Sequence, residues 1–554
     1  MEPGSGKSVV ALGLMETFAG KAHRTGFFRP IITADDDVPD PQLQLIRHRY
    51  QLDCPYERMY ALHAREAQSM IAAGAHAELE QRVFEAYKRL EPSFDVIVCE
   101  GTDFAGVLPA LDFDLNASLA NQLGSPVLVV IRGSTVPDIA AAVRIAKASL
   151  QHKGCSLFGV IVNRVAPELM AAMREHSVIY DPGEPMYVLA ENAALRHPTV
   201  AQVATELHAA VLAGEQHLHQ SVREVRVAAM NVEHFLEDLV DGMLVIVPGD
   251  RADIVLASVA ASALGGLPPV AGIVLTGGYQ PAPPIEQLLG TAPFAVLGTD
   301  ARTYQAATAV HAIVPRLTVA DAPQLATAIG VFEAGVDPDE LAQRVQLPRP
   351  AVKTPMMFQY ELLERAKARR RHIVLPEGED ERVLRAADIL LRRDVVDLTI
   401  LGRPDAVRGK AAALGLALDA ARLVDPRTDP RATVYAARYH ELRKHKGMTA
   451  ELALDVVAEG SYFGTLMVQT GAADGMVSGA VHTTADTIRP AFEIIKSSPG
   501  VSVVSSVFFM CLADRVLVYG DCAVNPRPDA EQLADIAIGS AQTATRFGVD
   551  ARIA

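Results

Sequence analysis

Tryptophan is absent from the sequence, and aromatic residues make up only 5% of its 554 residues. Hydrophobic residues nevertheless make up 50% of the chain, so we expect interiors of Ala, Val, Leu and Ile, as in α/β proteins, and no extensive disorder. A chain of this length has room for about three or four domains of roughly 150 residues.

Cysteine is scarce as well, and its spacing excludes two kinds of site. The five cysteines are Cys54, Cys99, Cys155, Cys511 and Cys522. No spacing among them resembles a metal knuckle or a redox motif, so we expect reduced, structural thiols.

An excess of positive charge is also lacking. The 51 Lys and Arg residues and the 66 Asp and Glu residues give a net charge of −15. Neither nucleic acid nor an anionic membrane would be attracted over distance, which excludes a general binder of either. An anionic substrate must therefore be met by locally placed arginines.

Long hydrophobic runs are missing. The first residues, Met1 to Lys7, contain no apolar core of a signal peptide. One uncharged run of 22 residues, Ile254 to Leu275, has the length of a bilayer span, but two glycines and two prolines between 265 and 269 interrupt it. We expect a helix, a turn and a buried strand there, no membrane association and a cytoplasmic protein.

Short apolar runs alternate with helical stretches, a pattern typical of parallel sheets built from strand-helix-strand units. We therefore expect a multidomain α/β protein with parallel-sheet, three-layer domains. The first domain is expected to cover 1–214 and the second 215–335, where a charged helical connector at 215–241 precedes new strands. The expected strands of these two domains are 94–99, 126–131, 158–162, 243–247, 272–275 and 294–297.

Prolines at 338, 348, 350 and 355 disfavour regular structure, so 336–355 is predicted to be a linker. The third domain is expected to cover 356–554. Its predicted elements are strands at 373–375, 396–401 and 501–509 and a helix from 530 to about 546. Because a sheet domain normally closes its layers and a further apolar strand is due, we expect the natural protein to continue past Ala554. We also expect it to begin before Met1, because only the second half of a phosphate-binding loop stands at the start of the sequence.

The start of the chain carries half of a phosphate-binding loop. Gly4-Ser-Gly-Lys-Ser8 precedes a helical stretch and matches the end of the pattern in which amides, a lysine and a hydroxyl hold nucleotide phosphates and Mg²⁺. Gly4, Gly6, Lys7 and Ser8 are therefore the candidate nucleotide-binding residues, although the pattern requires a glycine where Met1 stands.

Together with Val98-Cys-Glu-Gly101 and Gly159-Val-Ile-Val-Asn-Arg164, this loop resembles the dethiobiotin-synthetase-like ligase domains. Glu100 is expected near a metal at a strand end. Two interpretations stay open, namely a working ATP site and a nucleotide-binding fold kept for regulation or assembly, and we favour the second because a fold alone does not establish activity.

The middle segment is similar to the small regulatory DRTGG domain. The similarity rests on Pro248-Gly-Asp-Arg-Ala-Asp-Ile254 and Leu275-Thr-Gly-Gly278. The charged residues of the first motif fit a salt-bridged surface turn as well as a ligand site, so no chemistry is assigned to them.

The stretch from Ala473 to Pro490 is the most informative. Its small residues let a backbone approach a ligand, and its hydroxyl groups can donate to one. These residues are Gly475, Ser478, Gly479, Ala480, Thr483, Thr484 and Thr487. A helix is expected to begin between Thr483 and Pro490, because proline is tolerated in a first turn, and its free amides would face an anion.

Arg489 adds a permanent cation whose planar fork can hold two phosphate oxygens. This combination predicts a phosphate site. The alternative is a helix cap beside a structural arginine.

Residues 356–554 resemble the phosphate acetyl/butyryl transferase family through this stretch, through Val374-Leu-Pro-Glu-Gly-Glu-Asp-Glu-Arg382 and through Glu441-Leu-Arg-Lys-His-Lys-Gly447. The order of the three domains matches the long bacterial form of that enzyme. The resemblance implies that Arg489 contacts acetyl phosphate and that Arg443 and Arg382 bind coenzyme A.

The same resemblance places Ser478, Thr483 and Thr484 with the catalytic residues. His482, grouped with the coenzyme A-binding residues, is expected to be a hydrogen-bonding scaffold rather than a base, because the sequence shows no partner for it.

The implied reaction is that of an acyltransferase of acetate metabolism, which interconverts acetyl-CoA plus phosphate with acetyl phosphate plus coenzyme A. Coenzyme A is a substrate, no metal is obligatory, and a nucleotide is a possible regulator. The thiolate attacks the acetyl carbonyl, and cationic donors stabilise the oxyanion and the leaving phosphate. Family likeness also implies a homo-oligomer.

The family motif Asn-Asp-Leu-Ser-Arg-Gly, which carries a catalytic aspartate, is absent from these 554 residues. Three alternatives stay open. They are a phosphate butyryltransferase-like enzyme, an inactive or truncated regulatory protein that binds nucleotide or coenzyme A, and an ATP-dependent carbon-nitrogen ligase that uses the first domain.

Overall fold

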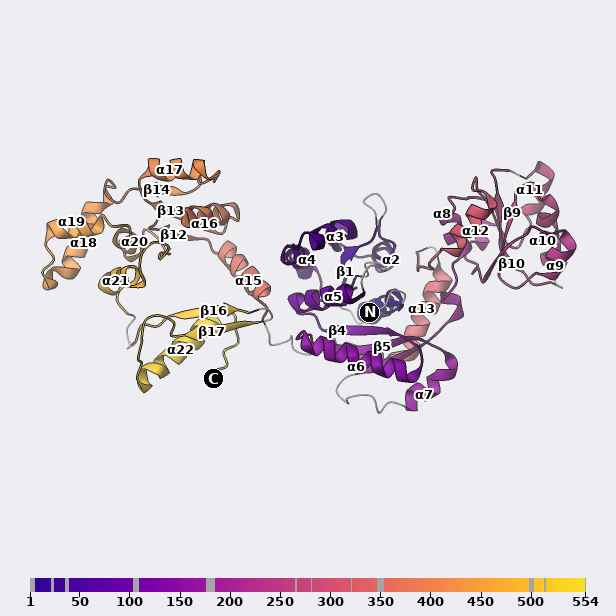
Figure 1. Ribbon diagram of the computed structural model, residues 1–554, viewed down its shortest axis with the longest axis horizontal. Coiled ribbons are helices and arrows are strands. Elements are labelled where there is room, and N and C mark those ends of the chain that lie inside the picture. Colours follow the sequence, from indigo (N-terminus) through magenta and orange to yellow (C-terminus); the bar gives the residue numbers. More distant parts are fainter. Residues whose placement is uncertain are drawn as a thin grey trace. The chain divides into compact units, whose positions relative to one another are not determined.

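The computed structural model divides into two compact units, Met1–Arg349 and Pro350–Ala554 (Figure 1). It describes residues 5–20, 24–34, 39–102, 109–175, 185–264, 267–279, 281–319, 321–345, 353–497, 503–512 and 515–553. The five cysteines all lie in these ranges and are free thiols, as expected. None of the helices in these ranges has both the length and the apolar character needed to cross a membrane.

The first domain contains two parallel sheets of three strands, in the orders β2-β1-β3 and β4-β5-β6. The strands are β1 (Thr25–Ile32), β2 (Tyr60–His63), β3 (Val96–Cys99), β4 (Val127–Arg132), β5 (Leu157–Val165) and β6 (Met186–Ala190). Helices α6 (Val136–His152) and α1 (Lys7–Ala19) cover opposite faces of the second sheet. Further helices are α2 (Pro41–Arg49), α3 (Ala64–Ala72), α4 (His76–Leu90), α5 (Pro109–Leu123) and α7 (Met170–Glu175). The three strands expected here are confirmed.

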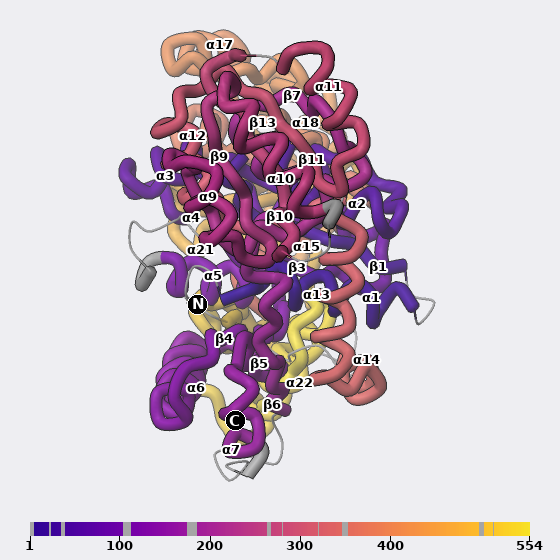
Figure 2. The backbone as a smooth tube through the Cα atoms, turned by 90° about the vertical axis from the view of Figure 1, so that its right-hand side faces the viewer, coloured from indigo at the N-terminus to yellow at the C-terminus, as the bar shows by residue number. Residues whose placement is uncertain are grey.

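Two helices from much later in the chain complete this domain. In α13 (Ala322–Gly335) and α14 (Pro338–Val345), Phe332 and Leu341 join a buried cluster with residues of α1 and β5. A Cβ atom on Gly13 of α1 would lie 2.1 Å from the Phe332 ring, so α1 and α13 are in close contact (Figure 2).

Helix α14 lies inside the range that was expected to be a linker, so that expectation does not hold for 338–345. Two physical reasons account for the helix. Pro338 stands at its first position, where proline is tolerated, and Leu341 is fully buried.

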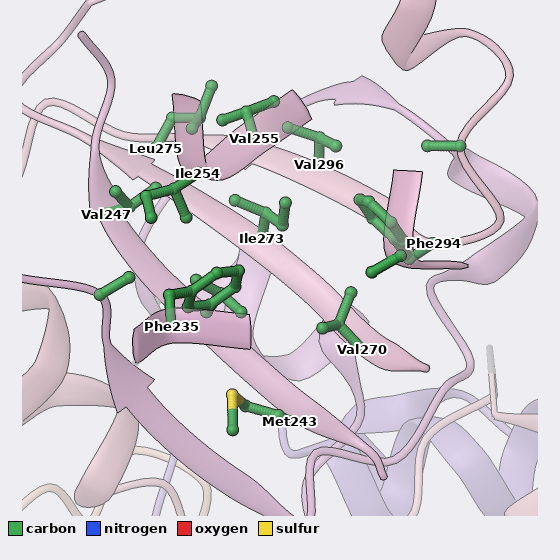
Figure 3. Close-up of a cluster of buried hydrophobic side chains, with 14 of the residues drawn as sticks. Phe235, Met243, Val247, Ile254, Val255, Val270, Ile273, Leu275, Phe294 and Val296 are labelled. Atoms are coloured by element: carbon green, nitrogen blue, oxygen red, sulfur yellow. The ribbon is translucent and has the colours of Figure 1, made fainter. Parts of the chain in front are cut away.

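The middle domain is a five-stranded sheet in the order β7-β11-β10-β9-β8, with β7 antiparallel to its neighbour and the other pairs parallel. The strands are β7 (Ala210–Ala213), β8 (Glu224–Val227), β9 (Met243–Pro248), β10 (Val270–Thr276) and β11 (Ala295–Gly298). Helices α9 (Val232–Glu237), α10 (Ala252–Leu264) and α11 (Pro283–Leu289) cover one face, and α8 (Val200–Glu206) and α12 (Thr303–His311) the other. Figure 3 shows the first of these faces, where Ile273 lies among side chains such as Ile254 and Phe235.

The expected helical connector at 215–241 is wrong over much of its length, because it contains β8, which pairs with β9. Val225 and Val227 alternate with charged residues there, a pattern that suits an edge strand. The middle sheet also includes β7, which ends at Ala213, just before the expected domain boundary.

The second unit has the expected three layers. Its parallel sheet runs in the order β14-β13-β12-β15, formed by β12 (Arg371–Leu375), β13 (Val396–Leu401), β14 (Arg422–Val424) and β15 (Gly475–Met476). Helices α16 (Glu381–Arg392) and α17 (Pro404–Ala413) cover one face, and α18 (Arg431–Arg443), α19 (Ala450–Val457), α20 (Gly460–Gln469) and α21 (Thr484–Ile494) the other.

An antiparallel pair, β16 (Val507–Cys511) and β17 (Val516–Gly520), follows with α22 (Ala530–Arg546), and α15 (Pro355–Ala368) precedes the sheet. The helix expected from 530 to about 546 is confirmed. The strand expected at 501–509 begins at Val507, and residues 501–502 lie outside the described ranges.

Candidate active site

The predicted phosphate stretch forms the loop between β15 and α21, next to the segment that leaves β12. Both loops lie at the carboxyl ends of parallel strands, the edge at which α/β sheets bind ligands. Helix α21 begins at Thr484, with Thr483 as its N-cap. The Thr483 hydroxyl accepts from the Asp486 amide at 3.3 Å and donates to the Asp486 carboxylate at 2.6 Å, so it is used within the cap.

Glu377, which the sequence did not single out, organises this loop. Its buried carboxylate accepts hydrogen bonds from the amides of Gly479, Ala480, Val481 and His482 at 2.8 to 3.0 Å. Burial raises the pKa of Glu377, but the amides and the His482 side chain outweigh it and lower the pKa to about 2. These four amides therefore hold an internal carboxylate and are not free to donate to a bound phosphate.

His482 has a partner that the sequence could not show. Its Nδ1 lies 2.8 Å from Glu377 Oε1, and its side chain is 42% exposed. This contact is what a scaffold residue would make.

Arg382 connects the loop to the start of α16. One Nη2 hydrogen bond reaches the carbonyl of Ala480 at 2.5 Å, and another reaches Asp380, the N-cap of α16, at 3.0 Å. The side chain is 71% exposed, so its outer edge is accessible to a ligand.

Arg443 stands at the end of α18 and faces α21. Its Nη2 donates to Glu493 at 3.2 Å, and the same carboxylate accepts from the hydroxyls of Tyr439 at 2.7 Å and Tyr462 at 3.1 Å. Burial and the Glu493 charge both raise the pKa of Tyr439. Within the described residues, the buried Nε of Arg443 has no hydrogen-bond partner.

Arg489 lies on α21, one turn before Glu493. Its Nη1 is 3.9 Å from Asp486, too far for a hydrogen bond, and its side chain is 59% exposed. The guanidinium is thus held only loosely by the protein and is open to an anion.

Two hydroxyl groups of the loop and of α21 are buried without a partner among the described residues. They belong to Ser478 and Thr487. Thr487 faces the loop, since a Cβ atom on Gly479 would lie 4.0 Å from its hydroxyl. An unsatisfied buried hydroxyl costs free energy, so both groups are suited to bind a ligand oxygen. Thr484, by contrast, is exposed at the first position of α21.

One expectation about this helix is wrong. Pro490 was expected in the first turn, but it is buried at the seventh helical position. Packing against the interior evidently outweighs the missing amide donor, which leaves the carbonyl of Asp486 without its helical hydrogen bond.

The phosphate loop at the chain start lies in the other unit. Gly6 has a φ of 82°, and a Cβ atom there would lie 2.2 Å from the Asn163 side chain, so the position requires glycine. Lys7 donates to the carbonyl of Gly101 at 3.0 Å. With Ser8, these residues line a cavity of about 290 Å³. Gly4 lies outside the described residues.

The motif of the middle domain forms a paired surface turn. Arg251 donates to both oxygens of Asp253, at 2.8 and 2.9 Å.

Comparison with known proteins finds a matching family for each of the three parts of the chain. Family models match residues 357–554 (Phosphate acetyl/butaryl transferase), 202–313 (DRTGG domain) and 1–221 (AAA domain). Phosphate acetyltransferases from Nitratidesulfovibrio vulgaris and Synechocystis are 42% and 40% identical over the whole chain, which covers 80% and 81% of them. The solved EutD phosphotransacetylase of Staphylococcus aureus is 43% identical, with a TM-score of 0.33, over 35% of this chain and 58% of its own. On the full-length similarity, this chain belongs to the phosphate acetyltransferase family.

Proposed function

We propose that the second unit binds the phosphoryl group of acetyl phosphate at Arg489, Ser478 and Thr487 for exchange of the acetyl group with coenzyme A. Two observations support the proposal. The exposed guanidinium of Arg489 lies 3.9 Å from Asp486, and the buried hydroxyls of Ser478 and Thr487 have no hydrogen-bond partner in the part of the chain that the structure describes. A guanidinium fork and two hydroxyl donors match the oxygens of a phosphoryl group.

The surrounding residues have distinct roles in this proposal. Glu377 fixes the loop so that Ser478 stands at the end of β15, and Thr483 caps the helix that carries Arg489. Arg382 and Arg443 bind the phosphates of coenzyme A, and His482 acts as a scaffold through Glu377. The protein thereby positions two anions and neutralises their charge.

The acyl group is proposed to be acetyl, in agreement with the names of the relatives. A slightly longer acyl group such as butyryl is the alternative to test, because one methylene changes binding by only about 1 to 3 kcal/mol. A homo-oligomer and a cytoplasmic location stay predictions.

The test is the rate of acetyl-CoA formation from acetyl phosphate in Arg489→Ala. We expect a loss of about 2 kcal/mol of transition-state stabilisation, roughly 30-fold in kcat/KM. The matched control is Arg385→Ala, because Arg385 is an exposed arginine of α16 paired with Glu381. If Arg489→Ala retains the wild-type rate, the proposed site is wrong.

We further propose that the cavity of the first domain binds a nucleotide as a regulator. Gly6, Lys7 and Ser8 at the start of α1 support this, because they present amides, an ammonium group and a hydroxyl to one cavity. Binding of ATP to the wild type and its loss in Lys7→Ala would support a nucleotide site.

A further inference from the structure

Two buried carboxylates face the phosphate loop. Asp40 and Glu100 line the same cavity as Lys7 and Ser8, and their side chains are only 2% and 5% exposed. In a phosphate loop of this kind the serine hydroxyl binds Mg²⁺, and nearby carboxylates complete the metal site. The sequence likewise suggested a metal near Glu100.

The side chain of Arg29, from β1, lies between these two carboxylates. Its Nη1 is 2.5 Å from Asp40 Oδ2, and its Nη2 is 3.5 Å from Glu100 Oε1. The guanidinium cannot lose its proton, so a permanent positive charge occupies the space between the two acids.

Asp40 is also engaged on its other side. As the N-cap of α2, its Oδ1 accepts from the amides of Gln42 and Leu43 at 3.0 Å, so reorienting the carboxylate toward a metal would uncap the helix. Within the described residues, no group of three or more His, Cys, Asp or Glu side chains is arranged to hold a metal ion. Mg²⁺ at a phosphate loop is usually bound through one or two carboxylates, waters and substrate phosphates. A divalent cation between Asp40 and Glu100 would meet the like charge of the Arg29 guanidinium, so these two carboxylates, paired as they are, do not fit it.

The charges of the described residues around the cavity nevertheless favour an anion. Among those that line it, five side chains are cationic and three are acidic, and two of the acids face Arg29. The cationic residues are Lys7, Arg29, Arg164, Arg196 and Arg316. Apolar side chains such as Val314 and Leu317 form part of the wall and can contact a flat base.

We propose that this cavity binds a nucleoside polyphosphate without a divalent cation, with the Arg29 guanidinium in the place that Mg²⁺ takes in other phosphate-loop proteins. The inference rests on the proposed nucleotide site and adds its metal independence. The polyphosphate charge is met by Lys7, Arg29 and the amides at the start of α1.

The test measures the affinity of the 554-residue chain for ATP by calorimetry, with excess Mg²⁺ and with EDTA. We expect the two Kd values to agree within about threefold, less than 1 kcal/mol. Tripolyphosphate, measured in parallel, is expected to bind more weakly than ATP if the apolar wall contacts the base. Equal affinities would assign the site to the polyphosphate alone and overturn the nucleoside part.

Arg29→Met removes the positive charge of the guanidinium and leaves Asp40 and Glu100 without their ion-pair partner. In this variant we expect ATP binding in EDTA to weaken by about tenfold or more and Mg²⁺ to restore part of it. The control is Arg24→Met, because Arg24 pairs with Asp95 on the surface and does not line the cavity. If Arg29→Met does not fold, the ATP affinities of the wild type with Mg²⁺ and with EDTA are sufficient to test metal independence.

Two results overturn the inference in distinguishable ways. Binding of ATP by the wild type that is tenfold or more tighter with Mg²⁺ refutes metal independence and leaves the nucleotide site intact. No binding of ATP under either condition refutes the nucleotide site as well.

Discussion

Replacing Glu377 by glutamine is expected to release the loop that carries the proposed phosphate site. The wild-type carboxylate accepts four amide hydrogen bonds and one contact from His482. The carboxamide keeps one acceptor oxygen and turns an NH₂ group toward amides that also donate, so some of these donors lose their partner.

The magnitude follows from the pKa. A pKa of about 2 in place of 4.5 corresponds to a preference of about 3 kcal/mol for the ionised carboxylate in the folded loop. Val481 and His482 are exposed, so water replaces some of the lost hydrogen bonds, and about 2 kcal/mol is a fair expectation for the variant.

The assay is hydrogen exchange of the amides of residues 479–482. About 2 kcal/mol predicts exchange roughly 30-fold faster in Glu377→Gln than in the wild type. The matched control is Glu379→Gln, because Glu379 is half exposed and makes a surface contact with Arg403 at 3.3 Å. Unchanged exchange in Glu377→Gln would show that the carboxylate does not hold the loop.

The same contact predicts a pH dependence. The pKa of Glu377 is lowered on folding, so its stabilisation of the loop is complete above pH 4.5 and is lost as the pH falls toward about 2. Glu377→Gln should remove this acid dependence, whereas Glu379→Gln should keep it.

Two further predictions concern positions that touch the site and the first domain. Glu493→Gln removes the charge that holds the Arg443 guanidinium in position. In steady-state kinetics KM for coenzyme A should therefore rise about tenfold, while KM for acetyl phosphate should stay unchanged. Gly13→Ala places a methyl group against Phe332 and should lower the free energy of unfolding of the first unit by about 1 to 3 kcal/mol, in denaturant titrations.

Each of these variants has a matched control. Glu441→Gln changes an exposed glutamate of α18 that pairs with Lys444, and it should leave both KM values unchanged. Gly330→Ala places a methyl group on α13 in open space, with no atom of the described residues outside the local helix backbone within 4 Å, and it should stabilise by up to about 1 kcal/mol, because alanine favours helix. Equal effects of a variant and its control would contradict the contact in question.

Local pattern was sufficient for the strand at 243–247, because a continuous apolar run of this length is typical of a buried parallel strand. It also indicated the strand at 396–401, although Asp397 and Thr399 interrupt the apolar residues there. It was not sufficient for β8, whose alternating charged and branched residues gain their stability from pairing with β9. The local pattern also missed α14. The prolines around it suggested a linker, but the helix forms because it buries Leu341.

The residues of the candidate site also fall into those that the sequence could indicate and those that it could not. Arg489, Ser478 and Thr483 could be proposed as site residues from the sequence, because they stand in one short stretch of unusual composition and in a family motif. Glu377 lies about a hundred residues earlier than the amides it binds, and no local feature of either segment indicates that pairing. Glu493 was missed for a similar reason, since its partners come from α18 and α20.

The return of α13 and α14 to the first domain means that the middle domain is an insertion rather than a successive module. The polypeptide leaves the first domain after β6 and comes back at α13, so the inserted sheet is tethered at two points. A fragment cut at residue 214 would lose Phe332 and Leu341 and expose the apolar surface around Val10 and Ile161. Dissection of this protein into separately expressed pieces should therefore keep residues 1–345 together.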